Sequence, residues 1–399
     1  MNDETRCVIS PPVETDGFDS LGVPIYRAST IPFPDAESYD TRHLRGDEGY
    51  SYGLSGTPTT RALERKITAL EQGVRTFLVP SGQAAISIAI LSFIAAGDRI
   101  LIADTVYPPL RDFAVRDLAK FGVDVVFYDP TAPEEVERLI TDRTRIVWAE
   151  SPGSTTMEMQ DIARISEIAH RHGALVGCDN TWATPLNFKP LAHGADIVVE
   201  ALTKYFSGHS DVLMGSITLR DAGAARTVKD TLSRLGVGVS PDDCSLVLRG
   251  METMAVRLRH AAQVARDLVD WIAGQPTVAE ILYPPLPASP GHALWRRDFR
   301  GGSGVFSIVF KPEAVPHVHA ALDTLKVFAI GASWGGTRSL VAPMRVRQFR
   351  TARPWTGDDL VLRISVGMEA ASDLMEDLSR FFDCLNGRSA PGPEAQSGA

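Results

Sequence analysis

The chain has 399 residues, of which 44% are hydrophobic, and a formal net charge of −9 at pH 7. This length allows two or three domains with a large buried core. The acidic balance, without a cluster of Lys or Arg, argues against nucleic acid or an anionic membrane as the main partner. No apolar run reaches membrane-spanning length, so we expect no membrane association.

The cysteines and the first residues indicate the compartment. Cys7, Cys178, Cys244 and Cys384 lie far apart, without the spacing of a zinc site or a disulfide framework. Residues 1–6 are polar and lack the apolar core of a signal peptide. We therefore expect a cytoplasmic protein without a bound metal.

Residues 1–62 are rich in Pro, Gly and Tyr and show little periodicity, which is typical of an extended arm. An arm without a core of its own must be held by the body of the chain or by a second subunit. A helix is expected to follow, over residues 61–71.

From residue 76 onward, apolar segments alternate with amphipathic ones, which predicts a mostly parallel sheet with helices on both faces. We expect strands at 76–79, 99–103, 123–128, 145–148, 174–178, 197–202 and 216–219, and helices at 82–96, 109–121, 133–140 and 161–172. Ligands of such sheets bind at the carboxyl ends of the strands. Residues that directly follow the strands are therefore the first candidates for a site.

A long helix over residues 242–274 leads into a smaller α+β part. Its strands are expected at 278–283, 304–310 and 360–366, and its helices at 315–325 and 371–385. Residues 389–399 are mostly Pro, Gly, Ala and Ser, and we expect disorder there. These patterns divide the chain into an arm (1–62), an α/β domain (63–250), an α+β domain (251–388) and a tail (389–399).

Lys204 is the central candidate residue. The apolar run 197–202 ends at Thr203 and Lys204, which is typical of a buried strand that delivers one amine into a cleft. Scarcity of water disfavours the ammonium form, so such a lysine can form the Schiff base that pyridoxal phosphate enzymes require. A lysine after a strand is more often solvated, so this interpretation depends on the other candidates.

Asp179 follows the strand expected at 174–178. A carboxylate beside the ring nitrogen of a pyridine cofactor would keep that nitrogen protonated, so that the ring can accept electrons from a substrate carbanion. The sequence Asp-Asn-Thr equally favours a helix cap or a turn.

Two more strand ends offer ligand-binding groups. Ser81, Gly82 and Gln83 stand where a strand turns into a helix, so free N–H groups could hold a phosphate, although most such serines are only caps. Tyr107 could stack on a planar ring, or simply pack ahead of two prolines.

Arg363 lies in the middle of the apolar run 360–366. A buried guanidinium needs an anion, and its planar fork suits the α-carboxylate of an amino acid, with a structural ion pair as the alternative. Upstream, Ser333 and Trp334 precede two glycines that allow a tight backbone near a ligand, or else form a turn with a packed tryptophan.

Together these blocks resemble a known family, the pyridoxal phosphate enzymes of cysteine and methionine metabolism. They follow the family's order from about residue 23 to residue 385 and are most similar to its bacterial cystathionine β-lyase branch. The matching blocks are Glu-Ser-Pro-Gly-Ser at 150–154, Asp-Asn-Thr-Trp at 179–182, Thr-Lys-Tyr at 203–205 with Gly-His-Ser-Asp at 208–211, and Ser-Trp-Gly-Gly at 333–336. The resemblance implies the α/β architecture of fold type I.

The resemblance also implies roles for the cofactor's ligands. Lys204 would hold pyridoxal 5'-phosphate and shuttle protons, Asp179 would pair with the ring nitrogen and Tyr107 would stack on the ring. The phosphate ligands would be Gly82, Gln83, Thr203 and, from a neighbouring subunit, Tyr52. A site shared between chains requires a homo-oligomer, and the family is usually a tetramer of two dimers.

Arg363 would bind the substrate carboxylate, with Ser333 and Trp334 beside it. The resemblance thus implies a C–S β-lyase that cleaves cystathionine or a related cysteine S-conjugate to a thiol, pyruvate and ammonia. Three alternatives stay open: a γ-synthase or γ-lyase, a lyase for other S-conjugates in specialised metabolism, and a catalytically idle scaffold.

Some positions depart from the family's pattern. Leu54 stands where the arm normally has a phosphate-binding arginine, and Ala201 stands where a serine is common. Without that arginine and that serine, cofactor binding should be weaker unless Arg61 or another residue compensates. Thr337 and Arg338 replace the usual Tyr-Glu, so the distal part of the substrate pocket is expected to differ.

Overall fold

Seven apolar segments between residues 75 and 219 form one sheet in the computed structural model, which describes residue 17 and residues 20–45 and 49–387. The strands are β1 Arg75–Val79, β2 Arg99–Ala103, β3 Asp124–Tyr128, β4 Thr144–Glu150, β5 Leu175–Asp179, β6 Ile197–Glu200 and β7 Gly215–Leu219. Their order is β1-β7-β6-β5-β4-β2-β3. Only β7 runs antiparallel to its neighbours, so the prediction of a mostly parallel sheet is confirmed.

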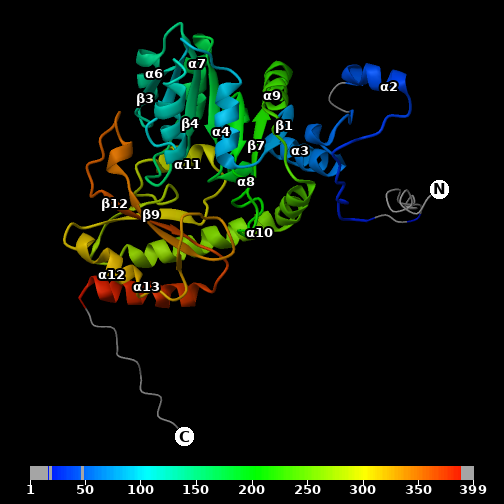
Figure 1. Ribbon diagram of the computed structural model, residues 1–399. Coiled ribbons are helices and arrows are strands. Elements are labelled where there is room, and N and C mark those ends of the chain that lie inside the picture. Colours follow the sequence, from blue (N-terminus) through cyan, green and yellow to red (C-terminus); the bar gives the residue numbers. More distant parts are fainter. Residues whose placement is uncertain (1–16, 18–19, 46–48, 388–399) are drawn as a thin grey trace.

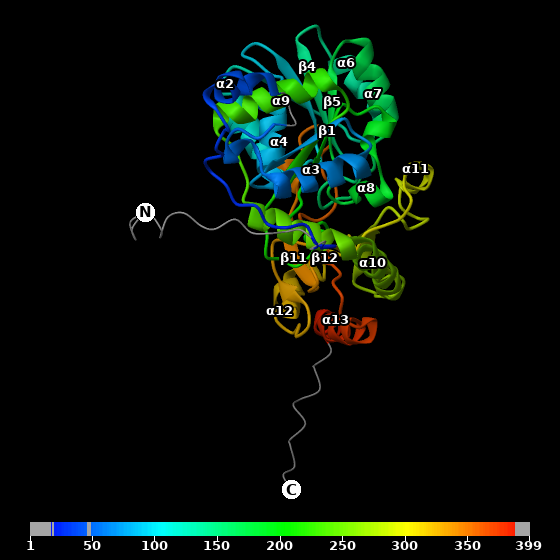
Figure 2. The ribbon, with the colours of Figure 1, turned by 90° about the vertical axis from the view of Figure 1, so that its right-hand side faces the viewer.

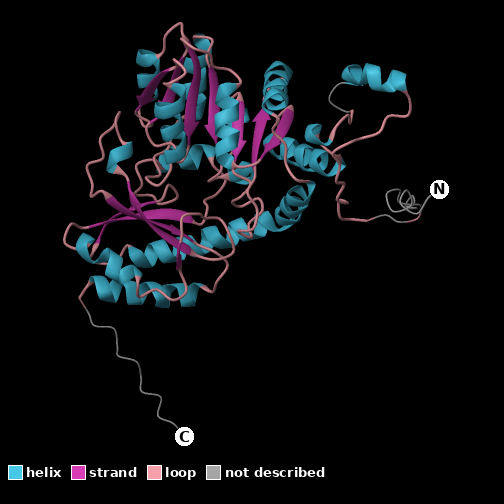
Figure 3. Ribbon diagram, in the orientation of Figure 1, coloured by secondary structure: helices cyan, strands magenta, loops and turns pink. Residues whose placement is uncertain are grey.

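Helices cover both faces of this large sheet (Figure 3). They are α3 Pro58–Glu71, α4 Gly82–Leu91, α5 Pro108–Phe113, α6 Pro133–Leu139, α7 Ile162–Arg171, α8 Thr184–Asn187 and α9 Ala222–Leu235, with a 3₁₀ turn at Pro190–His193. The longer ones begin at polar caps whose side chains accept a backbone N–H, namely Thr57, Ser81, Asp161 and Asp221. Because helices cover both faces, the inner strands are apolar along most of their length.

Several predicted helices differ from the observed ones. The helix expected at 82–96 ends at Leu91, because the following chain folds into a turn in which Asp98 accepts the N–H of Ala95. The helix expected at 109–121 divides into α5 and a π-helical turn, Ala114–Leu118. Helix α9 was not predicted.

A second sheet follows in the C-terminal part. Its strands are β8 Val278–Leu282, β9 Val305–Phe310, β10 Ala329–Ile330, β11 Leu340–Arg345 and β12 Leu360–Ser365, in the order β10-β11-β12-β9-β8. Helices α11 His292–Asp298, α12 Val318–Leu322 and α13 Ala371–Leu385 accompany it, with 3₁₀ turns at Val315–His317 and Arg347–Phe349. The sequence predicted β8, β9, β12 and α13 but not β10, β11 or α11.

Helix α10, Pro241–Ile272, connects the two sheets and contacts α3 at one end and β9 and α13 at the other (Figures 1 and 2). Buried residues occur along its whole length, from Cys244 to Ile272. The two sheets therefore share this helix as part of their core.

In its described residues, the arm carries α2 Ala36–Asp40, 3₁₀ turns at Thr41–Arg45 and Gly53–Ser55, and the first turn of α3. It stands at the side of α3 in Figure 1. Its attachments include an ion pair between Arg27 and Asp242 and a hydrogen bond from the N–H of Tyr26 to Thr59 Oγ1. Residues 1–16, 18–19 and 46–48 of the arm and the tail expected at 389–399 lie outside the described residues. No helix of the described ranges is long and apolar enough to span a bilayer.

Candidate active site

A cavity opens at the carboxyl ends of β2, β4, β5 and β6, the edge where the sequence predicts a site. Its empty volume, including the open mouth, is about 1000 Å³. All of the predicted site residues except Ser333 and Tyr52 line it: Gly82, Gln83, Tyr107, Asp179, Thr203, Lys204, Trp334 and Arg363. The structure thus brings together residues from both sheets around one space.

Lys204 lies in the turn that follows β6, where its N–H bonds to the carbonyl of Ala201 at 3.0 Å. Its Nζ donates to Ser333 Oγ at 2.7 Å and lies 5.4 Å from the ring centroid of Trp334. Burial, and then the charge of the nearby Arg363, lower the pKa of Lys204 to about 8. The amine therefore loses its proton far more readily than an exposed lysine does.

Asp179 is the last residue of β5. Its Oδ1 accepts hydrogen bonds from the N–H of Thr181 at 2.9 Å and from Thr181 Oγ1 at 2.6 Å. Burial raises the pKa of Asp179, whereas these two bonds and the charge of Lys204 favour the ionised form. No described residue donates to Oδ2, so this oxygen is free to accept from a ligand in the cavity.

Glu150 is a cavity residue to which the sequence analysis gave no role. It is the register partner of Asp179 on β4, and its Oε2 accepts the N–H of Tyr107 at 2.6 Å. Burial, and then the charge of Asp179, raise the pKa of Glu150 well above its ordinary value. Its position directly after an apolar run was the signal that could have identified it.

Glu200 ends β6 and forms a buried pair with Glu71 at the end of α3. Both side chains are almost fully buried, and Asn180 Nδ2 donates to Glu200 Oε1 at 3.0 Å. Burial raises the pKa of Glu71 to about 7 and that of Glu200 well above its ordinary value. The two carboxyls are therefore not both ionised near neutral pH.

The start of α4 also lines the cavity, with Ser81, Gly82 and Gln83. Ser81 Oγ accepts the N–H of Ala84 at 3.0 Å, and the preceding N–H groups of the helix have no intrahelical acceptor. A Cβ at Gly82 would stand 2.6 Å from the Cβ of Ala201, so glycine is needed for this close approach. Gln83 Oε1 is buried without a hydrogen-bond partner among the described residues.

Thr203 directly precedes Lys204 and also lines the cavity. Its Oγ1 donates to the carbonyl of Met214 at 3.2 Å and accepts the N–H of Met214 at 3.1 Å. The hydroxyl thus fixes the turn after β6 to the segment that enters β7.

Arg363 lies on β12 with only 7% of its surface exposed. Its Nη2 donates to the carbonyls of Ala332 and Ser333, and no carboxylate among the described residues pairs with it. Burial lowers the pKa of Arg363 to about 10. A buried guanidinium without an acid partner favours binding of an external anion over a structural ion pair.

Tyr107 and Trp334 form apolar walls of the cavity. Tyr107 directly precedes α5 and is 42% exposed. The ring of Trp334 packs 5.7 Å from that of Tyr205, and Gly335 takes a left-handed conformation, φ 79°.

Tyr52 lies away from the cavity of its own chain. It is 52% exposed and forms a β-bridge with Thr30 in the arm. Arg61 also lies elsewhere: its guanidinium bonds to the carbonyl of Ser55 at 2.8 Å and pairs with Glu64 at 3.3 Å. Arg61 therefore does not compensate, within this chain, for Leu54 in place of the expected arginine.

Comparison with known proteins agrees with this geometry. A profile of the Cys/Met metabolism PLP-dependent enzymes matches residues 4–383. The chain belongs to this family. It is 44% identical to a putative cystathionine beta-lyase of Rhizobium johnstonii over 96% of both chains, and 36% identical to an L-alanine/L-glutamate racemase of Wolbachia pipientis over 97% of this chain and 99% of that one.

The fold agrees as well. The crystal structure of cystathionine gamma-lyase from Lactobacillus plantarum complexed with L-serine superposes with a TM-score of 0.85 and 29% identity, over 97% of this chain and 100% of that one. The chain therefore has fold type I architecture, it is an enzyme, and pyridoxal 5'-phosphate is its cofactor.

The residues of the cavity fit this cofactor. It offers a buried amine of lowered pKa at Lys204, a carboxylate oxygen of Asp179 that no described residue occupies, and a helix start at Gly82 where a Cβ would collide. Helix starts of this kind bind phosphate groups. Among the described residues, the only lysine and arginine that line the cavity are Lys204 and Arg363.

Proposed function

We propose that this enzyme is a C–S β-lyase that cleaves cystathionine or a related cysteine S-conjugate to a thiol, pyruvate and ammonia. The observation that carries the proposal is the meeting of Lys204, Asp179 and Arg363 in one cavity. Relatives named cystathionine beta-lyase support the carbon–sulfur lyase class.

We assign the cofactor's ligands as follows. When bound, pyridoxal 5'-phosphate supplies an electron sink for negative charge at the substrate Cα. Lys204 would hold its aldehyde carbon, Asp179 its ring nitrogen and Tyr107 its ring face. The phosphate would be bound by Gly82, Gln83 and Thr203, joined by Tyr52 of a neighbouring subunit.

Lys204 would also act as the base. Once it is released by the substrate amine, its uncharged Nζ takes the Cα proton, and the thiolate at Cβ leaves. The remaining three-carbon fragment takes up water and gives pyruvate and ammonia. Arg363 binds the α-carboxylate, while Ser333 Oγ, which accepts a hydrogen bond from Nζ, holds Lys204 in place.

We further propose the division of labour expected from the sequence, with an arm (1–62) that serves a neighbouring subunit, a cofactor-binding domain (63–250) and a C-terminal domain (251–388). Exposed apolar residues of the arm, such as Leu21, Leu44 and Leu54, support a homo-oligomer, for which we propose a dimer of dimers. A cytoplasmic location stays a prediction from the sequence.

A racemase is the second candidate, because the similarity to the racemase of Wolbachia pipientis covers nearly the whole chain. Racemisation requires a proton at Cα to be removed and returned without loss of a group from Cβ. A γ-acting enzyme, such as the structurally similar cystathionine gamma-lyase, would release 2-oxobutyrate instead of pyruvate.

One experiment separates these functions. The purified holoenzyme is incubated with cystathionine, with several cysteine S-conjugates and with L-alanine, and pyruvate, 2-oxobutyrate and D-alanine are measured. Pyruvate as the main product supports the β-lyase. Dominant 2-oxobutyrate supports a γ-acting enzyme, dominant D-alanine supports a racemase, and a coloured holoenzyme that forms none of them refutes all three.

A further inference from the structure

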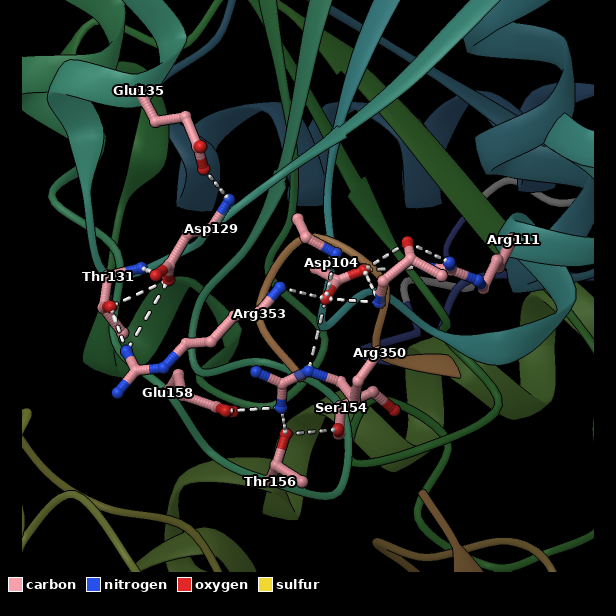
Figure 4. A network of polar contacts seen from close by, with 12 residues as sticks. Asp104, Arg111, Asp129, Thr131, Glu135, Ser154, Thr156, Glu158, Arg350 and Arg353 are labelled. Atoms are coloured by element: carbon pink, nitrogen blue, oxygen red, sulfur yellow. Dashed lines mark hydrogen bonds and ion pairs between the residues drawn. The ribbon is translucent and has the colours of Figure 1, made fainter. Parts of the chain in front are cut away.

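The two walls of the cavity come from different sheets. Tyr107 follows β2 of the large sheet, whereas Arg363 lies on β12 of the small sheet. Substrate binding between them depends on how the two sheets are fixed relative to each other. Asp104, directly after β2, is the centre of the polar network that joins them (Figure 4).

Asp104 is a fully buried carboxylate. It accepts hydrogen bonds from backbone N–H groups of the loop that connects β11 and β12 in the small sheet. Its Oδ2 accepts from Thr351, Ala352 and Arg353 at 2.9–3.0 Å. Its Oδ1 accepts from Arg111 Nη1 at 3.0 Å and again from the N–H of Thr351. Burial acts to raise the pKa of Asp104, but these donors hold it below its ordinary value. The carboxylate is thus charged and its hydrogen-bonding capacity is nearly used up.

The bound loop belongs to the strands that carry Arg363. Residues 346–359 leave the small sheet after β11 and return to it at β12. Asp359 closes the base of this loop by accepting the N–H groups of Val346 at 3.1 Å and Arg347 at 2.9 Å. Arg363 follows on β12 as the register partner of Ala342 on β11. A fixed loop tip therefore fixes both strands.

Arg350 extends the network to a third segment of the cavity. Its side chain is 3% exposed, its Nε lies 3.5 Å from Asp104 Oδ2, and its Nη1 donates to Glu158 Oε1 at 2.6 Å. The same Nη1 donates to Thr156 Oγ1 at 3.2 Å. The neighbouring residues Thr155 and Met157 line the cavity. Asp104 and Arg350 thus connect three segments: the one after β2 that carries Tyr107, the loop between β11 and β12 that leads to Arg363, and residues 155–157.

We propose that Asp104 is a positioning residue that sets the place of Arg363 relative to Tyr107, and thereby the grip on the carboxylate of the amino-acid substrate. The proposal rests on the carboxylate-binding role of Arg363 given above. It does not require Asp104 to touch substrate or cofactor, since its partners are the loop 350–353 and Arg111. The cofactor's proposed ligands on the large sheet and α4 should be unaffected.

The test is the variant Asp104→Asn in the holoenzyme. Asparagine offers one acceptor oxygen, and its NH₂ group would face donors, so part of the loop contact is lost at nearly unchanged volume. Binding is read from the change in the cofactor's visible absorption with L-alanine and with ethylamine, which is the same molecule without the carboxylate. We expect the Kd of L-alanine to rise about tenfold, as a small displacement of a binding group would cause, and that of ethylamine to stay unchanged.

Two further variants complete the experiment. Thr351→Val removes the hydroxyl that donates to Asp104 Oδ1 at 3.2 Å and accepts from Arg111 Nη2 at 2.6 Å, and it leaves the backbone N–H bonds to Asp104 in place. It should therefore give a smaller selective loss, and it decides the question if Asp104→Asn does not fold. Asp124→Asn is the control: it weakens a more exposed pair with Arg99 at the amino ends of β2 and β3 and should leave the Kd of both ligands unchanged.

Unchanged binding of L-alanine, or an equal loss of L-alanine and ethylamine, would overturn the proposal. Because L-alanine carries no leaving group at Cβ, the result does not depend on cleavage. A wild-type enzyme that releases no pyruvate would refute the lyase while leaving this test intact.

Discussion

Glu150 and Asp179 are register partners on the parallel strands β4 and β5, so two carboxyls stand side by side at the edge of the sheet that forms the cavity. Burial raises the pKa of both, but Asp179 accepts two hydrogen bonds from Thr181 that favour its ionised form, whereas Glu150 accepts one, from the N–H of Tyr107. Burial, and then the charge of Asp179, raise the pKa of Glu150 well above its ordinary value. We infer that this edge presents one negative charge to the cavity, at Asp179.

Lys204→Ala should abolish product formation and the visible absorption that sodium borohydride removes. The side chain bonds only to Ser333 among the described residues, so the fold should survive, which circular dichroism can check. Lys120→Ala, near Phe121 on the surface, is the control and should keep full activity. Appreciable pyruvate release by Lys204→Ala would rule out the assignment.

Cofactor uptake by the apoenzyme should depend on the proton of Lys204. Burial, and then Arg363, lower the pKa of this amine to about 8, so the reactive uncharged fraction increases as pH rises through that value. The rate of uptake should therefore rise between pH 7 and 9 in stopped-flow absorption, within about a unit of that pKa. In Arg363→Gln, which removes the neighbouring charge, the midpoint should move to higher pH; a shift to lower pH contradicts the electrostatic explanation.

The buried pair Glu71–Glu200 should make stability fall with rising pH. The pKa of Glu71 is raised to about 7 from its ordinary 4.5, so the folded chain binds more protons than the unfolded chain between these values. The free energy of unfolding should thus decrease by on the order of 2 kcal/mol between pH 5 and pH 7 and change little above about pH 8.

Glu71→Gln tests this, because an amide imitates the neutral acid. The variant should resemble the wild type at pH 5 and be more stable than it at pH 8 in urea unfolding. Glu376→Gln is the control. Glu376 is exposed and pairs with Arg380, so this change should alter the free energy of unfolding by less than about 1 kcal/mol at both pH values. If Glu71→Gln is equally destabilised at both pH values, protonation of this buried pair is not the cause.

Gly82→Ala should weaken cofactor binding. The added Cβ would stand 2.6 Å from the Cβ of Ala201, so the start of α4 must move away from the end of β6. We expect the cofactor's Kd to rise at least tenfold in a fluorescence titration, since the proposed phosphate contacts depend on this approach. Gly274→Ala, where the nearest atom would lie 3.5 Å away, serves as the control, and an unchanged Kd for Gly82→Ala would exclude the phosphate role of this helix start.

The sequence predicted the large sheet and the cavity because both depend on local signals. Apolar runs that end in a polar residue mark strand ends, and the topology of a parallel sheet gathers those ends at one edge. Lys204, Asp179 and Tyr107 were found in this way. Arg363 was found because a charge inside an apolar strand is conspicuous.

Other features depend on long-range packing that no local pattern reports. Glu71 looks like an ordinary acid at the end of a surface helix, and only the fold shows that it is buried against Glu200. Likewise, Asp104 has no motif, since its donors come from residues 351–353. Helix α9 is a different case, because its N-terminal cap Asp221 and the left-handed Gly236 at its end are local signals in the sequence.

Helix α10 has a consequence for how the chain can be divided. At Gly250 a Cβ would stand 2.3 Å from the carbonyl oxygen of Ser207, so the helix backbone lies directly against the turn that carries Lys204, and farther along the same helix buries Leu268 and Ile272. If the chain were cut within α10, each of the two pieces would expose part of this apolar stripe. Fragments separated after Ile272 instead keep the whole helix with the first piece, and they are the pair to co-express when reconstituting an active enzyme from two polypeptides.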